Sequence, residues 1–144
     1  MTQRSKRPPI LNHVLTPHWL ELDEIWRRKT LMVWIVMIAA MAMFSLLPNF
    51  GPPGVYGFDK IVHAATFFSL ALLPHVVFKQ RKTVLLAASG LILLGCAIEV
   101  AQAFVPGRDG DIWDAAANTA GVLTAVALGA RFRQIFGTMT SAAR

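Results

Sequence analysis

Four long apolar segments alternate with short polar ones along this chain of 144 residues. Each has about the 17–25 residues that an α-helix needs to cross the roughly 30 Å hydrocarbon core of a bilayer. Only 15% of the residues are charged, whereas soluble domains carry about 25%. The pattern therefore predicts an all-α fold, a four-helix transmembrane bundle. Its spans are Thr30–Leu47, Ile61–Phe78, Val84–Val105 and Trp113–Ala130.

A shorter amphipathic segment precedes the first span. Thr16-Pro17 is typical of a helix start, because threonine caps the first turn and proline suits its first position. Trp19, Leu22 and Trp26 recur at spacings of three and four, so they share a helix face, and tryptophan prefers the membrane–water interface. We therefore expect a short N-terminal interfacial helix. The expected organisation is a cytoplasmic N-terminal segment (1–29), a membrane domain (30–133) and a cytoplasmic tail (134–144).

The basic residues are distributed unevenly around these spans. Of the 14 lysines and arginines, all but Lys60 and Arg108 lie before the first span, between the second and third, or after the fourth. Loops rich in Lys and Arg stay in the cytoplasm. This rule predicts a multi-pass membrane protein with both termini cytoplasmic. The net charge of +6 then reflects topology, and we expect no nucleic-acid partner.

Small side chains characterise the third and fourth segments. Cys96 is the single cysteine, so an intramolecular disulfide is impossible, and we expect it to be a small buried apolar residue. Small residues also recur every four positions in the fourth segment. Such a stripe allows transmembrane helices to approach closely. The stripe consists of Ala117, Gly121, Ala125 and Gly129.

Polar side chains interrupt three of the four spans near the same end. A charged side chain at mid-bilayer costs about 2.5–3.5 kcal/mol on insertion scales, so this group requires an explanation. Spacings of three or four residues put Asp59 and His63 on one helix face, and do the same for Glu99 and Gln102 and for Asp111, Asp114 and Asn118. Glu99 lies about 10 Å from its helix end at 1.5 Å per residue. Alternating helix direction brings the three sets together in an outer polar pocket. The candidates are Asp59, Lys60 and His63, then Glu99 and Gln102, then Arg108 in a loop, then Asp111, Asp114 and Asn118.

Two uses of this pocket remain open. The polar groups can fasten the helices through hydrogen bonds worth about 0.6–2 kcal/mol each, with Asp111 or Asp114 capping the fourth helix. Alternatively, Lys60 and Arg108 at the pocket mouth can receive an anionic headgroup, since arginine binds phosphate and carboxylate groups well. They can equally pair with Asp59 and Asp109.

A divalent metal ion is another possible occupant of the pocket. Five residues offer suitable side chains, but the sequence has neither the HExxH pattern nor the paired cysteines typical of zinc sites. We therefore expect no metal and no cofactor. The five residues are Asp59, His63, Glu99, Asp111 and Asp114.

The ordered motifs of the chain resemble a known family. Asp59-Lys60-x-x-His63, Glu99-x-x-Gln102, Pro106-Gly107-Arg108 and Asp114-x-x-x-Asn118-x-x-Gly121 are similar to those of the VanZ-like family of small bacterial membrane proteins, over roughly residues 30–133. Its best-known member is associated with low-level resistance to the glycopeptide teicoplanin. Ala64-Ala65 replace bulkier residues common in the family. The resemblance implies that the functional candidates are Asp59, Lys60, His63, Glu99, Gln102, Arg108, Asp114 and Asn118.

These observations favour a non-enzymatic envelope protein. We expect its outer pocket to bind a lipid or cell-wall headgroup and to influence the envelope or glycopeptide tolerance. Membrane lipids and a lipid-linked or cell-wall-derived ligand are the expected partners. One alternative is a small intramembrane enzyme acting on a lipid-linked substrate, with Glu99 or His63 as acid/base and Arg108 stabilising negative charge. Another is a structural subunit of a membrane complex, which requires a membrane protein partner.

Overall fold

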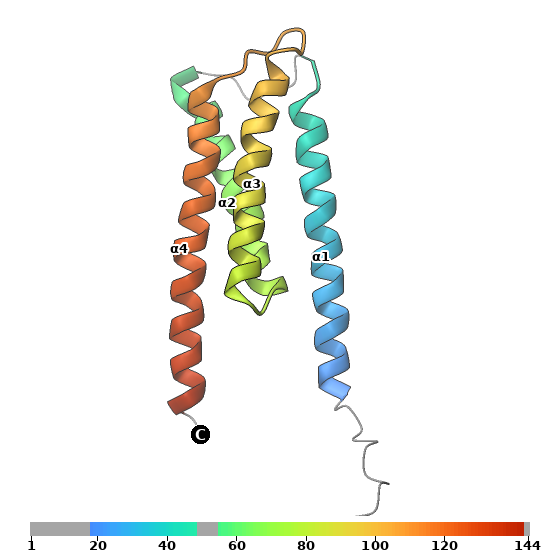
Figure 1. The fold of residues 1–144 in the computed structure, drawn as a ribbon, viewed down its shortest axis with the longest axis vertical. Coiled ribbons are helices and arrows are strands. Elements are labelled where there is room, and N and C mark those ends of the chain that lie inside the picture. Colours follow the sequence, from blue (N-terminus) through green and yellow to red (C-terminus); the bar gives the residue numbers. More distant parts are fainter. Residues whose placement is uncertain (1–17, 49–54, 143–144) are drawn as a thin grey trace, which may run out of the picture.

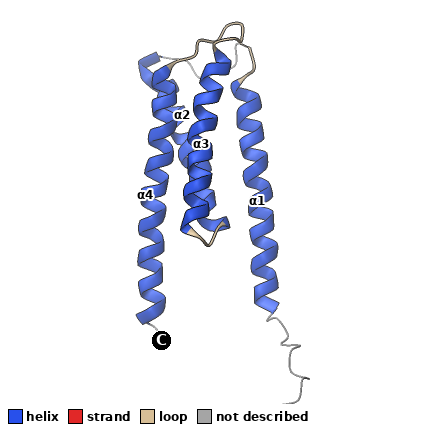
Figure 2. Cartoon of the chain, viewed as in Figure 1, coloured by secondary structure: helices blue, strands red, loops and turns tan. Residues whose placement is uncertain are grey.

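The described residues of the chain form four α-helices. The computed structural model describes the backbone of residues 18–48 and 55–142, and the side chains of residues 24–48 and 56–131. Within this part of the chain there is no strand (Figure 2), which confirms the all-α prediction. Thr16-Pro17 lies outside the described residues. The elements are α1 (His18–Ser45), the 3-10 helix η1 (Val55–Gly57), α2 (Phe58–Val77), α3 (Arg81–Gln102) and α4 (Ile112–Ala142).

The helices run alternately up and down (Figure 1). α4 packs most extensively against α2, whereas α1 contacts α2 and α3 from the other side of the bundle. α1 and α4 both extend beyond the turn that joins α2 to α3 (Figure 1). The bundle is therefore a core of α2, α3 and α4 with α1 at its edge.

Among the described residues, three helices are long and apolar enough to cross a membrane, namely Glu24–Ser45 within α1, Phe58–Val77 and Arg81–Gln102. The described part of α4 is less apolar because it includes Asp114 and Asn118. α4 forms as a helix where the sequence predicts one and continues well past Ala130. That it crosses the membrane stays a prediction.

The N-terminal amphipathic segment and the first span form one continuous helix. No glycine or proline interrupts the 28 residues of α1, so the backbone has no reason to bend at the expected boundary near residue 30. The most apolar stretch of α1 contributes no buried residue. α1 is held by two hydrogen bonds to main-chain carbonyls: the Trp34 indole N–H donates to Leu70 at 2.8 Å, and the Gln102 amide donates to Ser45 at 2.8 Å.

The small residues of α4 allow it to approach α2 closely. A Cβ atom added at Gly121 would collide with the carbonyl oxygen of Ala64, and one added at Gly129 would lie 2.5 Å from the imidazole of His75. The predicted stripe is therefore confirmed as a packing face. Around it lies a core cluster of Phe67, Leu70, Ala71, Ala88, Leu91, Val122 and Ala125.

Cys96 does not occupy the core. Its side chain is exposed, so the expectation of a buried cysteine is wrong. The neighbouring Gly95 faces the core instead, where an added Cβ would lie 3.1 Å from the ring of Phe67. Successive residues point about 100° apart around an α-helix, so a core-facing Gly95 turns Cys96 outward.

Candidate functional site

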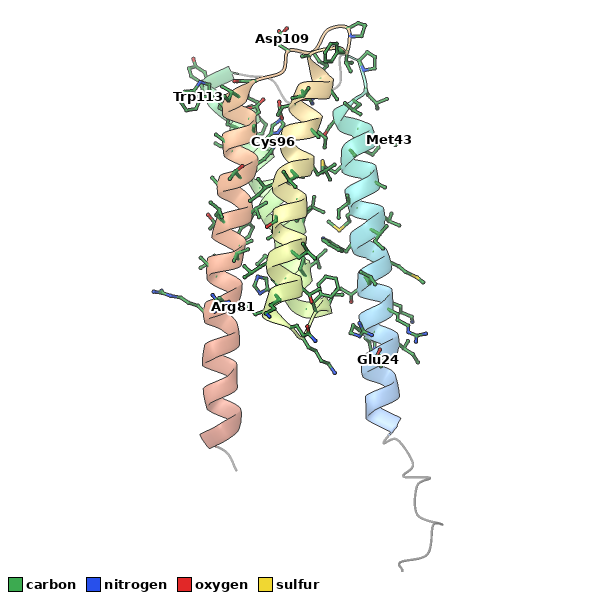
Figure 3. The ribbon with its side chains drawn as sticks, in the orientation of Figure 1. Glu24, Met43, Arg81, Cys96, Asp109 and Trp113 are labelled. Atoms are coloured by element: carbon green, nitrogen blue, oxygen red, sulfur yellow. The ribbon has the colours of Figure 1, made fainter. Side chains whose placement is uncertain are left out.

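The polar candidates gather at one end of the bundle. This end holds Asp109 and Trp113, opposite the end where Glu24 lies (Figure 3). The chain enters α2 through two left-handed residues, Tyr56 (φ 56°) and Gly57 (φ 73°). This turn places the charged residues that follow it in the first turn of α2, beside the start of α4.

Asp111 caps α4. Its Oδ1 accepts a hydrogen bond from the N–H of Trp113 at 2.9 Å, and its carbonyl oxygen accepts one from the N–H of Asp114 at 3.0 Å. An aspartate in this position satisfies amide groups that the first helical turn leaves without partners. The capping role predicted for Asp111 or Asp114 is therefore confirmed for Asp111.

The ammonium group of Lys60 is surrounded by three carboxylates. Its Nζ lies 3.0 Å from Asp59, 2.8 Å from Asp111 and 3.0 Å from Asp114. The predicted pairing of Lys60 with Asp59 is therefore confirmed. The two further carboxylates join the start of α2 to the start of α4.

The hydrogen bond from Lys60 lowers the pKa of Asp111, and the N–H of Trp113 lowers it further. A carboxylate with a lowered pKa stabilises the fold above its ordinary pKa of about 3.9, and this contribution disappears as the pH falls through the lower folded value. We therefore expect the Asp111→Asn protein to lose less thermal stability in acid than the unmodified protein does. The measurement is the unfolding midpoint in detergent from about pH 3 to 7. Asparagine also caps helices well, so the substitution mainly removes charge.

The control for this experiment is Asp109→Asn, which removes an exposed carboxylate from the same loop. This variant should lose as much thermal stability at low pH as the unmodified protein does. An equal reduction of this loss in both variants would contradict the role assigned to the contact between Lys60 and Asp111.

A second polar group joins α2, α3 and α4. The Asn118 amide nitrogen lies 3.5 Å from Glu99 Oε1, and the Asn118 Oδ1 lies 3.1 Å from His63 Nδ1. The other Glu99 oxygen accepts a hydrogen bond from the N–H of Asp111 at 3.3 Å. His63 Nε2 faces Asp114 Oδ2 at 3.7 Å. Asn118 is 1% exposed and Glu99 5%, so both lie within the protein.

The structure brings together seven of the nine predicted site residues. Gln102 is buried as well, but its amide bonds to the carbonyl of Ser45 and fastens α1. Arg108 lies half-buried in the loop between α3 and α4 and acts electrostatically on Glu99. The seven that form the polar cluster are Asp59, Lys60, His63, Glu99, Asp111, Asp114 and Asn118.

Sequence reasoning assigned no role to Gly110, yet this residue shapes the site. A Cβ atom added there would lie 2.5 Å from the carbonyl oxygen of Glu99. The absence of a side chain lets the loop fold onto the end of α3, so that the Asp111 N–H reaches the Glu99 carboxylate. The Asp-Gly dipeptide at 109–110 was the available signal, since it is typical of tight turns.

A groove opens beside the polar cluster, between the end of α3 and the start of α4. Its volume is about 510 Å³. Glu99 and Asp111 lie at its polar side, and exposed apolar side chains border the remainder. The other lining residues are Cys96, Val100, Ala103, Phe104, Gly110, Ile112 and Ala115.

A comparison with family models identifies the chain. The VanZ/LLP1 family model matches residues 9–133, so the match also takes in residues 9–29, which precede the motifs of the resemblance. No curated protein and no solved structure matches. The family match covers most of the sequence, and three helices in the part of the chain that the structure describes are apolar enough to span a membrane. The chain therefore belongs to the VanZ/LLP1 family and is a membrane protein.

Proposed function

We propose that this VanZ/LLP1 protein binds the headgroup of a lipid or of a lipid-linked cell-wall molecule on the outer side of the bacterial inner membrane. The bound molecule lies with its headgroup at the polar cluster and its chain in the adjacent groove. In this proposal the protein has four spans and cytoplasmic termini. Its binding influences the envelope and, through it, tolerance of glycopeptide antibiotics.

The charge of the two bundle ends supports this orientation. Seven described basic residues lie at the end that includes the turn between α2 and α3, and loops rich in Lys and Arg stay in the cytoplasm. At the other end, the ammonium of Lys60 is paired with carboxylates. The polar cluster then faces the outer leaflet. The seven residues are Arg27, Arg28, Lys29, Lys79, Arg81, Lys82 and Arg131.

The groove is the observation that carries the proposal. Its apolar wall includes Val100, Phe104 and Ile112, which are 64%, 84% and 80% exposed. Its two charged lining residues are Glu99 and Asp111, which connect the groove to the polar cluster. Lipids have the same division into an apolar chain and a polar headgroup, and ligand sites combine apolar walls with a few polar groups that fix orientation.

The charges at the site favour one class of headgroup. Carboxylates only accept hydrogen bonds, so they select groups that donate them, such as ammonium, amide N–H and hydroxyl groups. The ammonium of Lys60 is already held by three carboxylates and supplies little attraction for a phosphate. The expected headgroup therefore carries hydrogen-bond donors and is not a bare anion.

Filling the groove should prevent binding. We expect the detergent-purified chain to retain phosphatidylethanolamine, which has an ammonium headgroup, better than phosphatidic acid, which lacks one. Val100→Trp should lose this retention because the indole occupies the apolar part of the groove. Native mass spectrometry after addition of each lipid measures the retained fraction.

The matched control is Leu93→Trp, which places the same side chain at a position of α3 that is 71% exposed and outside the groove. This variant should retain phosphatidylethanolamine as the unmodified chain does. Equal retention by the Val100 and Leu93 variants would refute the groove as the binding site. Stronger retention of phosphatidic acid would refute the expected headgroup chemistry.

A further inference from the structure

Two groups of metal-ligating side chains lie side by side in the polar cluster. One consists of Asp59, Asp111 and Asp114, and the other of His63, Glu99 and Asp114; in each, one ligand atom per residue lies within 4.8 Å of the others. The ammonium of Lys60 contacts all three carboxylates of the first group. The first group thus already has its cation, and the second combines an imidazole with two carboxylates.

The hydrogen bonds of Asn118 determine how His63 is oriented. The side of Asn118 that faces Glu99 must be its NH₂ group, because a carboxylate only accepts hydrogen bonds. The amide oxygen then faces His63 Nδ1 at 3.1 Å, and Glu99 Oε1 lies 3.6 Å from the same nitrogen; because both neighbours are acceptors, Nδ1 carries a proton and donates to the nearer one. In the neutral imidazole the lone pair consequently lies on Nε2, which faces Asp114 Oδ2 at 3.7 Å. Two acceptors facing each other at this distance form no hydrogen bond.

Negative charge exceeds positive charge in the cluster. The cluster contains four carboxylates and one ammonium group, that of Lys60; with Arg108 of the adjoining loop counted as a second positive charge, an excess of two negative charges remains when His63 is neutral. Buried charge without compensation is strongly unfavourable, and one divalent cation would balance this excess.

We propose that His63 Nε2, Glu99 and Asp114 bind a divalent transition-metal ion, of which Zn²⁺ is the representative. Imidazole favours such ions over Mg²⁺ and Ca²⁺. Zn²⁺ binds nitrogen and oxygen at about 2.0–2.2 Å, which separates tetrahedral ligand atoms by roughly 3.4 Å. The observed 3.7 Å between His63 and Asp114 is close to this value.

The surrounding hydrogen bonds are those that support metal ligands. A histidine ligand commonly donates its other ring N–H to an oxygen acceptor, and carboxylate ligands are themselves hydrogen-bonded. Asn118 serves His63 in this way, and the Asp111 N–H serves Glu99. Three protein ligands leave a fourth position open for water or another ligand. The site does not depend on the proposed lipid binding.

Titration of the chelator-treated, detergent-purified full chain with Zn²⁺ tests the proposal by calorimetry. We expect one bound zinc ion per chain. His63→Gln and Glu99→Gln, which approximate the size of the original side chains, should each weaken binding by at least about tenfold, while far-ultraviolet circular dichroism confirms that both remain helical. Co²⁺ bound in place of Zn²⁺ should give the visible absorption of a tetrahedral site, which a purely structural role would not produce.

The matched control is Asp109→Asn, which removes one exposed carboxylate from the same end of the bundle and should leave Zn²⁺ affinity unchanged. Absence of saturable Zn²⁺ binding to the unmodified chain would overturn the proposal. So would a Zn²⁺ affinity that is the same in the unmodified chain and in both glutamine variants, since binding would then occur elsewhere. A preference for Mg²⁺ or Ca²⁺ over Zn²⁺ would overturn the assignment of the ion.

Discussion

Replacing Gly121 with alanine is expected to destabilise the bundle by about 1–3 kcal/mol, the usual cost of inserting atoms into a well-packed core. The new Cβ would collide with the carbonyl oxygen of Ala64 and lie 3.0 Å from the backbone nitrogen of Phe68. Both are main-chain atoms, so no side-chain rotation relieves the contact. α2 and α4 must separate, and these two helices share the most extensive contact in the fold.

The same substitution at Gly90 provides the matched control. Gly90 also lies inside a helix, but a Cβ added there meets nothing within 4 Å. Alanine should therefore stabilise α3 by about 0.5–1 kcal/mol, because glycine loses more conformational freedom in a helix. Thermal unfolding in detergent, followed by circular dichroism, compares the two variants. If both alanine variants raised, or both lowered, the unfolding temperature, close packing at Gly121 would not be what limits stability.

Replacing Asn118 with leucine should have the second large effect. The side chain is 1% exposed and links His63 to Glu99, so leucine leaves two polar groups without their amide partner. A buried polar group that loses its partner costs about 1–3 kcal/mol. We expect a loss of thermal stability in this range or above, measured in detergent.

Two comparisons make this result interpretable. Thr124→Leu also exchanges a polar residue of α4 for leucine. Thr124 is exposed, and its hydroxyl donates to the carbonyl of Ala120 within the same helix, so the effect on stability should stay within about 0.5 kcal/mol.

Glu99→Gln should remain folded, because the glutamine oxygen can still accept the Asp111 N–H. If this folded protein also keeps full lipid binding while Asn118→Leu unfolds, the Glu99 carboxylate has only a structural role, which favours the structural-subunit alternative.

The sequence predicted the helices well because apolar length and the spacing of glycine and proline are local properties. The ends of α2 and α3 lie within three residues of the predicted spans. α1 and α4 differ more. α1 joins two expected helices because no residue breaks it, and α4 continues to Ala142, past the point where apolar residues become sparse. Hydropathy detects membrane-crossing segments and not the helical turns beyond them.

The sequence also predicted the depth of the polar residues but not their partners. Spacing along each helix placed Lys60, Glu99 and Asn118 at one end, as the structure does. It could not show that Lys60 contacts three carboxylates or that Gln102 bonds to α1. These contacts depend on which helices are neighbours and how each is rotated, and neither property is recorded in a hydropathy pattern.

The position of α1 at the edge of the bundle gives the chain two regions under different constraints. Every residue of the polar cluster comes from α2, α3, α4 or the loop that joins α3 to α4. α1 is attached partly through the main-chain carbonyl of Ser45, which any residue at that position would provide. Most side chains of α1 can therefore be exchanged for other apolar ones without altering the site. The first helix is therefore where we expect lipid-facing substitutions to disturb the polar cluster least.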